Sequence, residues 1–156
     1  MDSAGHPTVA QMVRDVVAVH APEELAVAEG LARLDSRAAA RRLRGSGMRH
    51  ETLGFGLADV AALVTPVIWL VLNEVSQRAA AATVDRAGRG LGALWRRVFR
   101  RGGQTVVPPL SREQLGEVRR RLLEVAAERG LPQAKAIAVA DALMTTLALE
   151  QGEAEE

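Results

Sequence analysis

The side chains best suited to metal binding or acid–base chemistry in this chain are three histidines, since it contains no cysteine. His6, His20 and His50 include no pair at metal-ligand spacing on one helix, and His50-Glu51 lacks the second histidine of a zinc-protease helix. The lack of cysteine excludes disulfides, thiolate metal sites and cysteine nucleophiles. We therefore expect no metal site, and His20, on an apolar helix face, is predicted to be structural.

Other catalytic patterns are also missing from the sequence. No serine lies in a G-x-S-x-G elbow, and the glycines within 88–92 lack the spacing of a phosphate-binding loop and a strand before it. The paired carboxylates Glu23/Glu24 and Glu113/Glu117 occur at predicted helix starts and solvent faces, where stabilising helix N-termini is a sufficient role. We expect neither an enzyme nor a bound cofactor.

The composition favours helices as the elements that position these residues. The chain has 156 residues, which fits one domain, and 48% of them are apolar, but only 3% are aromatic and none is tyrosine. A core must therefore be built from leucine, valine and alanine, and chains rich in leucine and alanine favour helix. We predict an all-α helical bundle with one long central apolar helix and a C-terminal αα-hairpin.

The N-terminal region shows helical periodicity. It predicts an amphipathic helix over Thr8–His20, with a short strand at Val16–His20 as the alternative. Pro22 suits the first turn of a second helix. Ser36 is the expected N-cap of a short basic helix, Arg37–Arg44.

The middle of the chain combines strong apolarity with positive charge. Residues 53–72 are nearly continuously apolar, and a basic amphipathic stretch covers residues 84–101 and is expected to continue the helix. Residues 33–101 carry 13 arginines against five acidic residues, whereas both terminal regions are acidic. The predicted organisation is therefore a helical region, 1–101, that contains both segments.

The C-terminal part is predicted in most detail. Gly102-Gly103 and Pro108-Pro109 bracket an expected linker, 102–110, before a helical hairpin at 111–149 and an acidic, frayed tail at 150–156. Ser111 and Gln114 form a capping-box pair, and Gly130 suits the C′ position of the first hairpin helix. Apolar residues are expected to line the second helix; they are Ile137, Ala140, Leu143, Met144 and Leu147.

Insertion of residues 53–72 into a membrane is energetically balanced. Their 20 residues reach about 30 Å as a helix, and 11 of them are Leu, Ile, Val or Phe, which together contribute on the order of −5 kcal/mol towards insertion. Asp59 opposes insertion by about 2.5–3.5 kcal/mol if it lies deep in the bilayer, and Pro66, Thr65 and two glycines oppose it further, so the sum lies near zero. We expect Asp59 to lie in the N-terminal turn of the long helix if the bundle is soluble.

Membrane association is the function that we predict from these segments. A basic amphipathic helix with Trp and Phe suits an anionic lipid surface, and the alternative is an ordinary core-facing helix with a charged outer face. Nucleic acid binding is not expected, because base-reading side chains are missing between the arginines. The residues predicted to contact a membrane or partner are Trp69, Leu91, Leu94, Trp95, Arg96, Arg97, Val98, Phe99, Arg100 and Arg101.

The predicted protein is non-enzymatic and cytoplasmic, and it associates with the inner face of the cell membrane. In the alternative function, a soluble adaptor or oligomeric interaction protein buries the apolar segment in a protein core. Its partners would then be another protein or a second copy of the chain.

Several short phrases of the sequence resemble uncharacterised small helical proteins of actinomycete bacteria. The resemblance implies a helical architecture and a lineage but no activity. It is spread over most of the chain and is carried by Ala21-Pro22-Glu23-Glu24-Leu25, Leu53-Gly54-Phe55-Gly56, Val64-Thr65-Pro66-Val67, Pro109-Leu110-Ser111-Arg112-Glu113-Gln114-Leu115, and Gly130-Leu131-Pro132 ahead of Ala140-Asp141-Ala142-Leu143.

Overall fold

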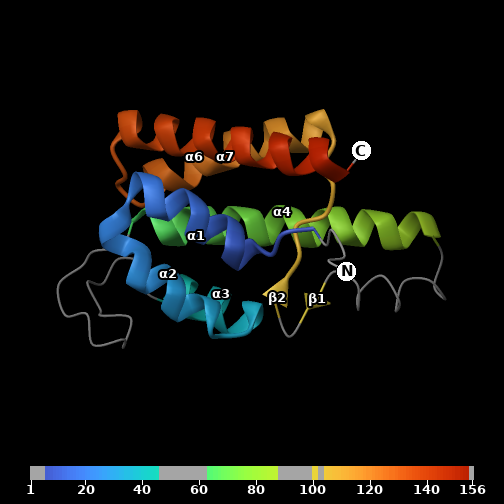
Figure 1. The fold of residues 1–156 in the computed structure, drawn as a ribbon, viewed down its shortest axis with the longest axis horizontal. Helices are drawn as coiled ribbons and strands as arrows, with labels where there is room; N and C mark the ends of the chain where they lie inside the picture. Colours follow the sequence, from blue (N-terminus) through green and yellow to red (C-terminus); the bar gives the residue numbers. More distant parts are fainter. Residues whose placement is uncertain (1–5, 46–62, 88–99, 102–103, 155–156) are drawn as a thin grey trace.

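The protein is an all-α helical bundle, as predicted (Figure 1). The computed structural model describes residues 6–45, 63–87, 100–101 and 104–154. The elements are α1 (Val9–His20), the 3-10 helix η1 (Pro22–Glu24), α2 (Leu25–Ala32), α3 (Ser36–Gly45), α4 (Val64–Ala87), β1 (Arg100–Arg101), β2 (Gln104–Thr105), α6 (Arg112–Glu128) and α7 (Gln133–Ala154).

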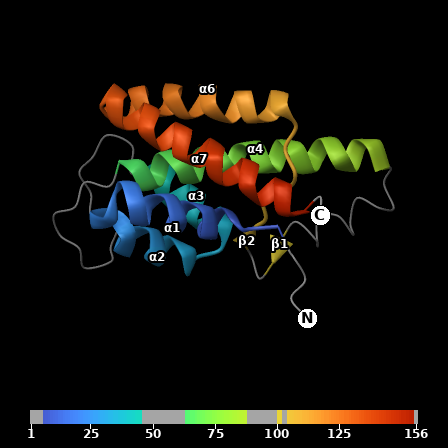
Figure 2. The same cartoon turned by 45° about the horizontal axis from the view of Figure 1, so that its top comes forward.

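The helices form three layers, and α1 and α4 make up the middle one. Helix α4 packs against α1, α3 and α6, and α1 packs against α2, α4 and α7. The hairpin of α6 and α7 covers one side of this middle layer, and α2 and α3 lie on the other (Figures 1 and 2). The C-terminal end of α4 extends beyond the hairpin (Figure 1). Helices α1 and α4 therefore supply much of the core.

Helix caps account for where the N-terminal helices begin. Thr8 and Gln11 form a capping box at the start of α1, so the predicted helix is confirmed and the alternative strand at its end is wrong. Helix α3 begins one residue earlier than expected. Its cap is Asp35, whose Oδ1 accepts a hydrogen bond from the Ala38 N–H at 2.7 Å, and the prediction that Ser36 is the cap is corrected.

The start of α4 is held by a carboxylate from another helix. Glu24 is 4% exposed, and its Oε1 accepts hydrogen bonds from the N–H groups of Leu63 at 2.9 Å and Val64 at 3.0 Å. Its Oε2 accepts one from the Thr65 N–H at 2.7 Å. The next residue, Pro66, has no N–H to satisfy, which is why proline is tolerated in a first turn. One negative charge thus serves a buried helix N-terminus.

Helix α4 covers only part of the predicted apolar segment, residues 53–72. The helix begins at Val64, so the described helix contains only the second half of the predicted segment, and residues 53–62, with Asp59, lie outside the described residues. The described part of α4 reaches Ala87, and residues 88–99 lie outside the described residues.

The expected linker is part of the fold. Strand β1 pairs antiparallel with β2, so Arg100 and Arg101 lie in a strand instead of a helix. The Val107 N–H donates to the Pro7 carbonyl at 2.8 Å, and Val107 is 3% exposed. The residues after β2 therefore pack into the bundle, where Val107 is hydrogen-bonded to the segment that precedes α1.

Side chains from the second half of the chain bind the C-terminal ends of the first three helices. Lys135 donates through Nζ to the His20 carbonyl at the end of α1. Arg129 donates to the Leu43 carbonyl at 3.2 Å, near the end of α3, and Gln104 donates to two carbonyls at the end of α2. The positive charges of Lys135 and Arg129 are favourable there, because the helix dipole is negative at the C-terminal end.

In the C-terminal hairpin, α6 has the predicted caps at both of its ends, and α7 is longer than predicted. Ser111 and Gln114 form the capping box, and α6 closes with a Schellman motif, in which the Gly130 N–H donates to Ala127 and the Leu131 N–H to Ala126. Helix α7 continues to Ala154, so the expected frayed tail is helical through that residue.

Gly130 provides a test of the hairpin turn. Its φ of +79° is in the left-handed region, so Gly130→Ala is expected to lower the free energy of unfolding by about 1 kcal/mol. Gly116 is the matched control, because it lies exposed within α6 with nothing within 4 Å of an added Cβ. Gly116→Ala is expected to raise stability by about 0.5–1 kcal/mol. Urea unfolding measures both, and equal signs would contradict the account.

Candidate interaction surface

Trp69 lies in the centre of the core. Its exposed fraction is 0%, and its neighbours in α4 from Val64 to Leu72 are buried except for the half-buried Leu70. An indole in that position is not available to a lipid surface or to a partner protein. The prediction that Trp69 makes such a contact is therefore corrected, because the helix turns this residue into its own bundle.

Most of the predicted basic contact segment lies outside the described residues. This applies to Leu91, Leu94, Trp95, Arg96, Arg97, Val98 and Phe99. Arg100 and Arg101 are described only as strand β1, paired with Thr105 and Gln104. Among the described residues, no helix is both long enough and apolar enough to cross a membrane.

A polar seam runs along the buried side of α4. It consists of Thr65, Trp69, Asn73 and Ser76, which recur at three- and four-residue spacing and so share one helix face. Asn73 Oδ1 accepts a hydrogen bond from Thr105 Oγ1 at 3.1 Å. For the other three polar groups, the described part of the chain supplies no hydrogen-bond partner. The seam therefore weakens the core, since a buried unsatisfied polar group costs about 1–3 kcal/mol.

Removing one of these hydroxyls is expected to stabilise the protein. Ser76 is 1% exposed, and its hydroxyl has no hydrogen-bond partner among the described residues. Ser76→Ala removes this hydroxyl, so the free energy of unfolding should rise by about 0.5–1.5 kcal/mol. Thr105→Val is the opposing control, because it removes the donor to Asn73, and it should lower stability. Thermal unfolding measures both variants, and a loss of stability in Ser76→Ala would contradict this account.

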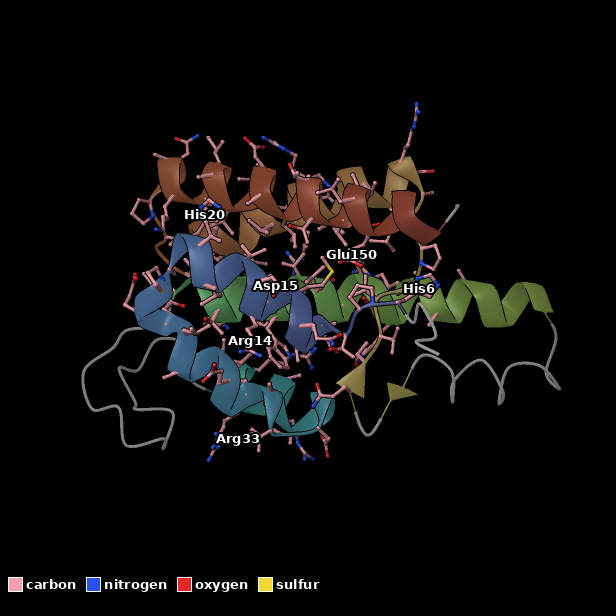
Figure 3. The ribbon with its side chains drawn as sticks, in the orientation of Figure 1. His6, Arg14, Asp15, His20, Arg33 and Glu150 are labelled. Atoms are coloured by element: carbon pink, nitrogen blue, oxygen red, sulfur yellow. The ribbon has the colours of Figure 1, made fainter. Side chains whose placement is uncertain are left out.

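The described histidines and acids do not gather into a catalytic or metal site. His6 and His20 lie at opposite ends of α1, and Asp15 and Glu150 lie on separate helices (Figure 3). Within the described ranges, no group of three or more His, Asp or Glu side chains could hold a metal ion. His50 lies outside those ranges.

An ion-pair network connects α4 to α6 at the surface. Arg78 pairs with Glu74 and Glu117, and Arg121 lies 3.4 Å from Glu74 and 3.3 Å from Glu124. The hydrogen bond that Arg121 donates to Glu124 and the negative charge of Glu74 raise the pKa of Arg121 above its ordinary value. These ion pairs therefore link α4 to α6 at the surface, where each such pair contributes about 0–1 kcal/mol to stability.

The exposed residues of α7 include fewer charged side chains than those of α6. Most exposed residues of α7 recur at helical spacing along one stripe, and Gln133 and Glu150 are exposed outside it. Helix α7 lies at the outside of the bundle and packs against α6 and α1 (Figure 2). We call this the α7 stripe; it consists of Ala134, Ile137, Ala138, Asp141, Thr145, Ala148, Leu149 and Gly152.

Two large apolar side chains distinguish the α7 stripe. Leu149 is 66% exposed and Ile137 is 38% exposed, and the third large exposed apolar residue of the described chain, Val19, lies on α1. Asp141 is the one charged residue of the stripe, and Arg119 on α6 neutralises it at 3.1 Å. Ile137 was predicted to lie in the hairpin core, but Ala136 and Val139 are buried there instead. The helical spacing of the buried residues in α7, continued as far as Leu149, indicates which face of this helix is exposed.

Comparison of the chain with family models, with curated proteins and with solved structures finds no match. The resemblance to actinomycete proteins therefore stays a prediction.

Proposed function

We infer that the protein is a non-enzymatic helical interaction protein whose apolar segment builds its own core. The observation that supports this proposal is the burial of Val64–Leu72 between α1, α3 and α6. Eight of these nine residues, which were candidates for lipid contact, are buried among protein side chains, and Leu70 is half-buried. Burial of these residues thus stabilises the folded bundle, and their apolar surface is not available to lipid.

The other apolar surface favours a protein partner over lipid. The α7 stripe carries an ion pair, Arg119–Asp141, alongside its apolar residues. Inserting that pair into hydrocarbon is costly, whereas protein interfaces regularly combine an apolar centre with charged edges. Small side chains along the rest of the stripe permit the close approach of another helix.

Vesicle flotation tests this function against membrane association. The purified full chain is mixed with anionic phosphatidylglycerol vesicles and with neutral phosphatidylcholine vesicles, and floated without detergent. We expect it to stay in the aqueous fraction with both, and expressed protein to be recovered in the soluble fraction of cells, with none retained on membranes after an alkaline carbonate wash.

Four substitutions in the basic segment provide the discriminating control. They are Arg96→Glu, Arg97→Glu, Arg100→Glu and Arg101→Glu, combined in one variant. Flotation of the parent chain with anionic vesicles, abolished in this variant, would overturn the proposal and favour the membrane function. Equal behaviour of the two chains in the aqueous fraction supports an interaction protein.

A further inference from the structure

The layer formed by α2 and α3 differs in charge from the hairpin on the opposite side of the bundle. Residues 25–45 contain five arginines against two acidic residues, Glu29 and Asp35. Residues 112–154, in the hairpin, contain six basic and seven acidic residues. One outer layer of the bundle is thus clearly positive, whereas the other is nearly neutral.

Strand β1 adds its two arginines to the positive layer. It pairs with β2, and Gln104 of β2 donates through Nε2 to the carbonyls of Ala32 at 3.0 Å and Leu34 at 2.5 Å, directly before and after Arg33 in the chain. Because paired strands lie about 4.8 Å apart, β1 lies beside the end of α2 (Figure 1). We call residues 25–45 and 100–101 the basic layer; its seven arginines and two acidic residues give it a net charge of +5.

Three arginines of the basic layer have no carboxylate partner. The side chains of Arg33, Arg41 and Arg44 are exposed, and within the described ranges none of them forms an ion pair or a hydrogen bond. Figure 3 shows Arg33 on the outer side of the layer. Arginines elsewhere in the fold are paired with acidic residues; they include Arg14, Arg78, Arg119, Arg120 and Arg121.

Both acidic residues of the basic layer already have partners of their own. Glu29 lies 3.7 Å from a guanidinium nitrogen of Arg14 on α1. Asp35 accepts the hydrogen bond from the Ala38 N–H that caps α3. The positive charge of Arg33, Arg41 and Arg44 is therefore available to a partner molecule.

Carboxylates are well suited to such a surface. A guanidinium group offers two parallel N–H donors to one carboxylate, and this charge-assisted pairing is stronger than an ordinary hydrogen bond. Arg41 and Arg44 are three residues apart in α3, so they lie on one helix face, where a single acidic segment can reach both. Opposite charges also steer the encounter of two proteins.

The composition of the basic layer favours an acidic protein segment over lipid. The large exposed apolar residues of the described chain are Val19, Ile137 and Leu149, and all three lie outside this layer. A helix that lies in a membrane interface needs an apolar face as well as basic residues. The described part of the basic layer offers only the charge.

Nucleic acid is also a poorer match than an acidic protein segment. Residues 25–45 contain no aromatic residue, asparagine or glutamine, so they provide neither stacking surfaces nor amides for the bases. The whole chain carries a net charge of only +1. A long polyanion therefore gains little attraction beyond the basic layer itself.

We propose that the basic layer binds an acidic segment of a partner protein, with Arg33, Arg41 and Arg44 as the residues that contact its carboxylates. The proposal rests on the proposed function and names the chemistry of the partner.

A fluorescein-labelled peptide of about ten glutamates, roughly 33 Å long when extended, is the probe. It is titrated with the full chain at low salt, and fluorescence anisotropy reports binding. We expect saturable binding with a dissociation constant in the micromolar range. Binding should be lost at about 1 M salt, where the Debye length is about 3 Å. Absence of saturable binding at low salt would overturn the proposal.

Two triple variants of equal net charge locate the binding. The combined substitutions Arg33→Gln, Arg41→Gln and Arg44→Gln should weaken it at least about tenfold, since three charge-assisted contacts are lost. The matched control combines Arg112→Gln, Arg119→Gln and Arg120→Gln in α6, and it should bind as the parent does. Far-ultraviolet circular dichroism of both should match the parent. Equal weakening in the two variants would overturn the assignment to the basic layer.

An oligothymidylate with the same number of charges as the peptide tests the choice of partner. Weaker or equal binding of the oligothymidylate supports an acidic protein segment, whereas tighter binding would overturn that choice. Failure of the proposed function is reported separately by vesicle flotation, in which neither the peptide nor the oligothymidylate takes part.

Discussion

Replacing Trp69 with alanine is expected to lower the free energy of unfolding by about 3–5 kcal/mol, the usual cost of deleting a large aromatic side chain from a core. Trp69 is 0% exposed, and Val67, Ile68, Val71 and Leu72 around it in α4 are equally buried. The bundle is small, and a loss of this size is a large fraction of typical domain stability.

Two controls accompany this substitution. Trp69→Phe retains most of the apolar volume and removes the indole N–H, which has no acceptor among the described residues, so it should cost far less than alanine. Leu149→Ala removes an exposed apolar side chain and should change stability by no more than about 0.5 kcal/mol. Urea unfolding of the four chains measures the differences. An alanine variant as stable as the parent would contradict burial of Trp69.

Loss of the Glu24 carboxylate is expected to have the next largest effect. Glu24→Ala leaves the backbone N–H groups of Leu63, Val64 and Thr65 without their acceptor. Since each unsatisfied buried donor costs about 1–3 kcal/mol, and water can reach part of this site, we expect a loss of about 2–4 kcal/mol.

The neighbouring Glu23 is the matched control for Glu24. Its side chain is exposed, so Glu23→Ala should change stability by no more than about 0.5 kcal/mol. Glu24→Gln keeps one acceptor oxygen and should lie between the two alanine variants. Equal stability of the Glu23 and Glu24 variants in thermal unfolding would contradict the role of Glu24 at the start of α4.

Local signals in the sequence predict much of the helical architecture. The capping box at Ser111 and the C′ glycine at Gly130 are confirmed, because caps depend on residues only a few positions apart. The carboxylates of Glu23 and Glu24 were expected to stabilise a helix N-terminus. Glu24 does so for α4, whose first residues follow it by 39–41 positions, and no local pattern indicates such a partner.

The burial of Trp69 and of its neighbours in α4 was not predicted from the sequence, and the reason is physical. Hydropathy measures how strongly a segment avoids water, but it does not distinguish lipid from a protein core as the alternative. Val64–Leu72 is buried by helices that are distant in the sequence. The exposed stripe on α7 was missed for a related reason, since Ile137 is apolar and one turn from core positions, and only the packing of α7 determines its exposure.

If Val64–Leu72 forms part of the bundle core, Trp69 must have protein and not lipid around it. Trp95→Phe leaves Trp69 as the single tryptophan of the chain, and its fluorescence can be measured with vesicles of brominated phosphatidylglycerol, which quench indoles that enter the bilayer. We predict blue-shifted emission that aqueous iodide does not quench, and that is the same with and without these vesicles. Quenching of Trp69 by the brominated lipid would contradict the account.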